Sequence, residues 1–67
     1  MIMLYDIYDD YDGPSTYIGT AVSQKQAETI MSDYFNDTDG EANLYAIRSD
    51  GKVFVLGYED ILEEVEQ

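Results

Sequence analysis

The residues best equipped for chemistry are the carboxylates of the stretch YDIYDDYDG, residues 5–13, where aspartates are interleaved with tyrosines. Two carboxyl groups held close together catalyse acid–base reactions when a concave, partly apolar pocket separates their pKa values. Asp9, Asp10 and Asp12 are close enough in sequence to supply such a pair, but a chain of 67 residues has little interior in which to build the pocket. The chain also lacks histidine, the commonest general base, and cysteine, a common nucleophile. We therefore expect a protein that is not an enzyme.

Two short acidic turns could instead bind calcium. The segments DYDG at residues 10–13 and DTDG at residues 37–40 resemble the centre of an EF-hand loop. The first ligand position of that loop is Tyr8 in one segment and Phe35 in the other, and neither segment has the closing glutamate. The sequence therefore predicts no specific metal site and no cofactor. A weak divalent-ion binder that uses the aspartate clusters stays an alternative.

The tyrosines of the same stretch fit a protein interface better than a catalytic site. Tyr5 shares one face of a predicted strand with Met3 and Ile7, so it is expected in the core. Tyr8 and Tyr11 flank the three aspartates, where a rigid ring with a polar tip is typical of an interface anchor. The aspartates would attract a basic partner and the rings would hold it.

The net charge narrows the class of partner. Fifteen acidic residues against three basic ones give a formal charge of −12. Direct binding to nucleic acid or to an anionic membrane is disfavoured, because both need lysine and arginine. A field of this sign attracts basic surfaces, and these belong largely to proteins that handle nucleic acids. No signal-peptide pattern or membrane-spanning run is present, so we expect a cytoplasmic protein.

The elements that position these groups follow from the pattern of apolar residues. Strands are predicted at residues 2–8 and 16–20, with a turn at residues 12–15. Ser23 and Gln26 form a capping box in front of a helix whose apolar stripe has helical spacing. The stripe consists of Ala27, Ile30, Met31, Tyr34 and Phe35.

A second hairpin and a second helix complete the predicted fold. Asp50-Gly51 predicts a two-residue type I′ turn that would pair Ile47 with Phe54, and Tyr45, Ile47, Phe54 and Leu56 would share a face. The apolar spacing in residues 58–67 predicts a short C-terminal helix. The whole chain, residues 1–67, is then one α+β domain of ββαββα order, an antiparallel sheet with two packed helices.

In length, acid excess, lack of cysteine and histidine, and its Tyr/Asp stretch, the chain resembles the small acidic inhibitors encoded by bacteriophages and mobile elements. These include anti-CRISPR proteins, anti-restriction proteins and inhibitors of uracil-DNA glycosylase, many of which mimic DNA. The resemblance implies a stoichiometric inhibitor in the host cytoplasm that binds the basic surface of a nuclease or of another DNA-acting protein. The residues expected to contact the partner are Tyr8 and Tyr11 as anchors, with Asp9, Asp10, Asp12, Asp37, Asp39, Glu59, Glu63 and Glu64 in place of phosphates.

A plain interaction module is the main alternative to DNA mimicry. In that reading the acidity serves solubility, and the chain is a regulatory homodimer that associates through an apolar sheet face. Both faces of the predicted second hairpin are apolar enough to need cover, and two helices within one chain need not cover both.

Overall fold

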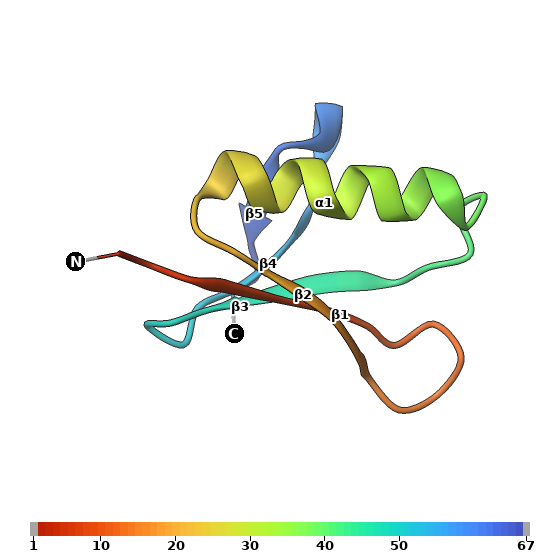
Figure 1. Cartoon of the computed structure of the whole chain (residues 1–67), viewed down its shortest axis with the longest axis horizontal. Helices are drawn as coiled ribbons and strands as arrows, with labels where there is room; N and C mark the ends of the chain where they lie inside the picture. Colours follow the sequence, from red (N-terminus) through yellow and green to blue (C-terminus); the bar gives the residue numbers. More distant parts are fainter. Residues whose placement is uncertain (1, 67) are drawn as a thin grey trace.

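A computed structural model describes residues 2–66 as one antiparallel sheet with a single α-helix lying across one of its faces (Figure 1). The strands lie side by side in the order β2-β1-β3-β4-β5. In chain order the elements are β1 (Tyr5–Asp9), β2 (Thr16–Ala21), α1 (Gln24–Asp37), β3 (Leu44–Arg48), β4 (Val53–Leu56), the 3-10 turn η1 (Tyr58–Asp60) and β5 (Leu62–Glu64).

Helix α1 begins and packs as its local sequence predicts. The Ser23 side chain accepts a hydrogen bond from the Gln26 N–H, and the Gln26 side chain accepts one from the Val22 N–H. This reciprocal cap satisfies two backbone donors at the start of the helix. Ala27 and Met31 are fully buried against the sheet. Phe35, predicted in the same stripe, is 43% exposed near the C-terminal end.

The predicted C-terminal helix is wrong. Residues Tyr58–Asp60 form only the turn η1, and Leu62–Glu64 form strand β5, which pairs with β4. Glu59 and Asp60 have φ values of 57° and 59°, in the left-handed region that ends a right-handed helix. Strand β5 satisfies backbone groups that β4 would otherwise expose at its edge. Over residues 2–66 the fold is α+β with five strands and one α-helix, so the predicted ββαββα arrangement with two packed helices is also wrong.

The predicted register of the second hairpin is wrong by one residue. Ala46 pairs with Phe54 and Ile47 pairs with Val53, so Ile47 and Phe54 lie on opposite faces. The loop has three residues, because the Arg48 N–H bonds to the Lys52 carbonyl at 2.8 Å. Gly51 closes the loop at a φ of 90°, where an L side chain would be strained. A one-residue slip exchanges the faces of a whole strand, so the predicted apolar surface of Tyr45, Ile47, Phe54 and Leu56 does not form.

The core lies between α1 and the sheet. Tyr5 and Ile7 of β1 face the helix as predicted, whereas Met3 precedes β1 and is partly exposed. Small side chains let the helix approach closely, and the buried set is Tyr5, Ile7, Ala21, Ala27, Met31, Leu44, Ala46, Phe54 and Leu62. Within residues 2–66 no element covers the opposite face of the sheet (Figure 1).

Candidate functional site

Two acidic segments that are far apart in sequence meet at one end of the molecule. The β1–β2 loop and the segment that follows α1 are joined by a backbone hydrogen bond of 3.2 Å from the Asp10 N–H to the Asn43 carbonyl. The Asn43 side-chain amide donates to the Asp10 carboxylate as well. We call this region the acidic end, and it comprises Asp9, Asp10, Asp12, Asp37, Asp39 and Glu41.

Asp9 holds the acidic end together. Its carboxylate accepts hydrogen bonds from the Asn43 and Tyr11 N–H groups, each at 3.0 Å, and from the Tyr34 hydroxyl at 3.1 Å. These donors, the Asn43 N–H first, lower the pKa of Asp9, and the bond to Asp9 raises the pKa of Tyr34. The Asp9 carboxylate, predicted to contact a partner, is therefore largely occupied by its own chain.

The helix terminus adds to the negative charge of this end. The negative pole of the α1 dipole coincides with Asp37, and no basic residue lies in the last turn. Asp39 and Gly40 then turn the chain with φ values of 54° and 80°. Tyr11 and Asp12 are exposed in the neighbouring loop. Helix stability does not explain Asp37, because an acid is unfavourable at that position.

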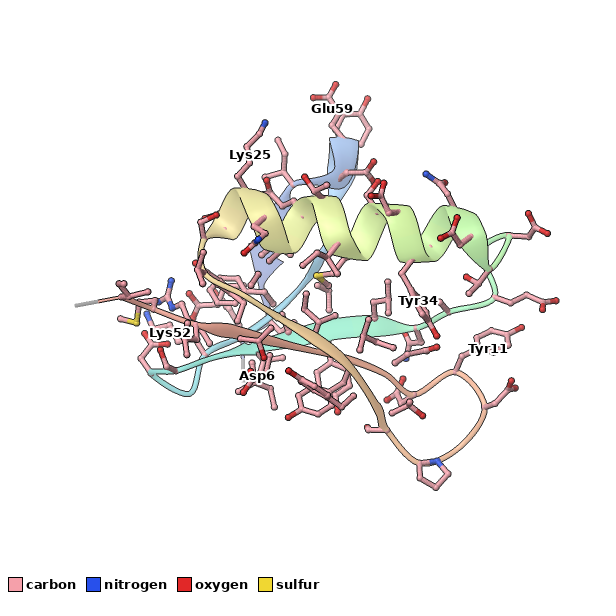
Figure 2. The ribbon with its side chains drawn as sticks, viewed as in Figure 1. Asp6, Tyr11, Lys25, Tyr34, Lys52 and Glu59 are labelled. Carbon is pink, nitrogen blue, oxygen red and sulfur yellow. The ribbon has the colours of Figure 1, made fainter. Side chains whose placement is uncertain are left out.

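The three glutamates of residues 58–67 that were predicted to contact the partner lie outside the acidic end. Glu59 extends from η1 beyond the helix, far from Tyr11 and the acidic end (Figure 2). Glu63 pairs with Val55, which places it on the uncovered face of the sheet. Glu64 approaches Lys52 with a nitrogen–oxygen distance of 3.8 Å. These three glutamates therefore share no single surface with the aspartates.

A shallow groove of about 410 Å³ separates α1 from η1, and acids line much of it. The Glu28 carboxylate accepts the Leu62 N–H at 2.9 Å, and Ser32 donates to Asp60 at 3.2 Å. The bond from Leu62 is the main cause of the lowered pKa of Glu28. The carboxylates of Glu28 and Asp60 thus attach the segment from η1 to β5 to the helix.

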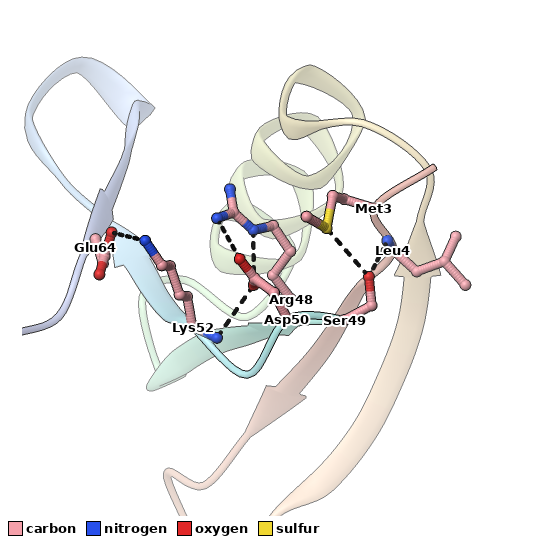
Figure 3. A network of polar contacts seen from close by, with 7 residues as sticks. All are labelled: Met3, Leu4, Arg48, Ser49, Asp50, Lys52 and Glu64. Carbon is pink, nitrogen blue, oxygen red and sulfur yellow. Dashed lines mark hydrogen bonds and ion pairs between the residues drawn. The ribbon is translucent and has the colours of Figure 1, made fainter. Parts of the chain in front are cut away.

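All three basic residues lie away from the acidic end. Lys25 is in the first turn of α1, about 20 Å along the helix from Asp37. Arg48 makes two hydrogen bonds to Asp50, of 2.8 and 2.9 Å, beside Lys52 (Figure 3). This pairing lowers the pKa of Asp50 to about 2 and raises that of Arg48. Positive charge is thus confined to the opposite end.

The second candidate surface is the uncovered face of the sheet. Tyr8 stacks on Tyr45 with centroids 5.4 Å apart, and the rings of Tyr8 and Tyr17 meet edge to face with centroids 5.8 Å apart. We call this surface the open face, and it comprises Tyr8, Tyr17, Tyr45, Ile47, Val53 and Val55, with Asp6 and Glu63 among them. Asp6 lies on the side of the sheet away from α1 (Figure 2).

The two tyrosines predicted to act together as anchors, Tyr8 and Tyr11, lie on different surfaces. Tyr8 belongs to the open face, whereas Tyr11 lies at the acidic end. Tyr17 and Tyr45 were not predicted to take part, and neither was Glu41. A register shift in β2 pairs Tyr17 with Tyr8 and Thr20 with Asp6, so both β2 residues reach the same face. The interleaved tyrosines of residues 5–17 indicate an aromatic surface, but which of them share a face depends on how β1 pairs with β2 and β3.

Comparison with known proteins gives no match to a family model, to a curated protein or to a solved structure. In the part of the chain that the structure describes, no three acidic side chains are arranged to hold a metal ion. No helix among residues 2–66 has the length and apolar character required to cross a membrane. The two candidate surfaces are the acidic end and the open face.

Proposed function

We propose that this protein is a stoichiometric inhibitor that binds the basic nucleic-acid-binding surface of a DNA-acting protein. The carboxylates of the acidic end would occupy positions that phosphates take in the complex with DNA. One observation carries the proposal: the chain gathers acids from two distant segments at one end and keeps all three of its bases elsewhere. An acidic surface that served only solubility would not need this segregation.

The structure narrows the residues on which the proposal rests. Asp10, Asp12, Asp37 and Asp39 lie together at the acidic end with Tyr11 exposed beside them. Asp9 supports these residues from within. Glu59, Glu63 and Glu64 lie on other surfaces and are no longer proposed as part of the same phosphate-like array.

The first test is capture of a partner from bacterial lysate at low salt, followed by elution with double-stranded DNA. The eluted protein is identified by mass spectrometry and then purified. Its DNA binding should be lost at one equivalent of inhibitor, and the complex should weaken as salt is raised. Inhibition that persists against excess DNA and is insensitive to salt would contradict the mimicry.

Matched charge variants make that test specific. The triple variant Asp12→Asn, Asp37→Asn, Asp39→Asn removes three charges from the acidic end. The control Asp33→Asn, Glu59→Gln, Glu66→Gln removes three exposed charges elsewhere. The first variant should lose inhibition, and the control should keep most of it. Equal losses would mean that net charge alone governs binding.

A regulatory homodimer is the second candidate, and the open face is the observation that favours it. A second copy of the chain could bury Tyr17 and Ile47 without any foreign partner. However, it would bring two chains of charge −12 together with Asp6 and Glu63 on each contacting face. Sedimentation equilibrium at low and high salt tests this candidate, since a dimer opposed by repulsion should strengthen as salt is added.

A further inference from the structure

We infer that the open face is a docking site for arginine side chains of the target protein. The proposed function uses the acidic end and not the open face. Only the identity of the protein that would carry the arginines rests on the proposed function. The open face and the acidic end would then contact one partner in two ways, through rings and through carboxylates.

The rings of the open face are held in place before any partner binds. The Tyr45 hydroxyl is 2.7 Å from the Ser15 hydroxyl, and the Tyr17 hydroxyl is hydrogen-bonded to Thr20. Thr20 in turn donates to the Asp6 carboxylate at 2.7 Å. Tyr17 is nevertheless 58% exposed. A fixed ring with an accessible surface loses little side-chain entropy when a ligand stacks on it.

The charge of the open face selects a cation. Asp6 and Glu63 lie on this face, whereas the described basic residues all lie off it. Lys25 is on α1, Lys52 approaches Glu64, and Arg48 lies on the helix side. A cation above Tyr17 would meet a ring face and a nearby carboxylate with no competing positive charge.

Arginine fits this surface better than lysine. A guanidinium is planar, so it stacks on a ring and still directs N–H donors towards a carboxylate such as Asp6. The chain already contains this contact on its other face, where Arg48 lies 5.0 Å from the centre of the Phe54 ring and bonds to Asp50. An ammonium is more strongly hydrated and has no plane to stack.

Charge also decides against the other occupants. Nucleic-acid bases stack on tyrosines, but their phosphates would be repelled by a chain of charge −12. A second copy would oppose Asp6 and Glu63 to the same residues of the first. The second copy is an outcome that the experiment below distinguishes.

The test uses two defined probes, a ten-residue peptide of alternating glycine and arginine and its glycine–lysine counterpart. The isotope-labelled protein is titrated with each peptide at low salt and followed by NMR. The arginine peptide should shift the ring signals of Tyr8, Tyr17 and Tyr45, and it should bind more tightly than the lysine peptide. Tyr17→Ala should weaken its binding by about two- to fivefold.

Tyr58→Ala is the matched control, because Tyr58 is 85% exposed on η1, outside the open face. It should leave the affinity for the arginine peptide unchanged. The inference is overturned if shifts are confined to the acidic end, if Tyr17→Ala has no effect, or if the two peptides bind alike. It is also overturned if the open-face signals shift with protein concentration alone, which would assign the face to a second copy.

The two proposals can fail separately. The peptide titration needs no target protein, so its outcome does not depend on the mimicry of DNA. If Tyr17→Ala weakens peptide binding and the acidic-end variant still inhibits fully, the open face is supported and the phosphate mimicry is not. The reverse result would leave the mimicry in place and remove the arginine site.

Discussion

The two faces of the sheet differ in how far their side chains are covered. The face under α1 holds Tyr5 and Phe54 together with aliphatic residues and alanines, and three of its members, Ala21, Ala46 and Ile7, are completely buried. The open face holds three tyrosines, Tyr8, Tyr17 and Tyr45. The hydroxyls of Tyr17 and Tyr45 form hydrogen bonds within the chain. Small side chains allow close packing, whereas tied rings present a fixed surface to solvent.

This contrast separates stability from recognition. The covered face supplies most of the buried apolar area of the fold. The open face leaves apolar area in contact with water, which is a cost unless a partner removes it. Matched substitutions on the two faces should therefore differ in the size of their effect.

Ile7 and Ile47 are a matched pair on neighbouring strands and opposite faces. Ile7→Ala should lower the free energy of unfolding by about 2–5 kcal/mol, because the side chain is fully buried. Ile47→Ala should cost less than about 1 kcal/mol, since Ile47 is 37% exposed. Urea unfolding measures both changes, and Ile7→Val, at about 0.5–1.5 kcal/mol, serves if the alanine variant does not fold. Equal losses would mean that something covers the open face.

Asp9 and Asp6 repeat the comparison with charged groups on one strand. Asp9 faces the helix and accepts three hydrogen bonds, whereas Asp6 on the open face accepts one from Thr20. Asp9→Asn should therefore lower the melting temperature more than Asp6→Asn does. Because the folded pKa of Asp9 lies below its ordinary value of 3.8, its stabilisation is present above that pH.

The pH dependence tests the cause of that difference. As pH falls through the lowered pKa of folded Asp9, the carboxylate is protonated and its stabilisation is lost. The gap between the wild-type protein and Asp9→Asn should thus be widest above about pH 4 and should close below it. Thermal melts between pH 2 and pH 7 would show this. A gap that stays constant with pH would contradict the role of the charged carboxylate.

Gly51 and Gly19 compare the loop that sets the register with a position in strand β2, beside its register shift. Gly51→Ala should destabilise the protein by about 1 kcal/mol, because alanine is strained at a φ of 90°. Gly19 has a negative φ and open space around it, so Gly19→Ala should stabilise by about 0.4–1 kcal/mol. Chemical unfolding gives both signs. A neutral Gly51→Ala would mean that the loop can adopt another turn, and with it another register.

Elements with strong local signals were predicted correctly from the sequence. Helix α1 carries its cap at Ser23 and Gln26 and a buried stripe at Ala27 and Met31, so its position depends on nothing remote. The tail lacks such signals. The spacing of the apolar residues around Leu62 suits either a helix or a strand. These residues form a strand because they pair with the edge of β4, which depends on tertiary structure.

The candidate site was harder to predict because it depends on pairing across the sheet. Asp50-Gly51 is compatible with loops of two and of three residues, and both need Gly51 in a left-handed conformation, so local chemistry does not choose the register. That choice places Ile47 beside Val53 rather than Phe54. The shift in β2, which brings Tyr17 to Tyr8, is likewise visible only when the strands are paired.

The smallest predicted effect concerns the acidic end. Asp37→Asn should stabilise the protein by about 0.3 kcal/mol, because it removes an acid from the C-terminal end of α1. Asp33→Asn, one turn earlier, is the matched control and should change stability less. Precise thermal melts of both variants would detect the difference. If Asp37→Asn both stabilises the fold and weakens inhibition, the acid is retained for its partner at the expense of the helix. If it destabilises the fold, Asp37 has a structural role and leaves the proposed contact set.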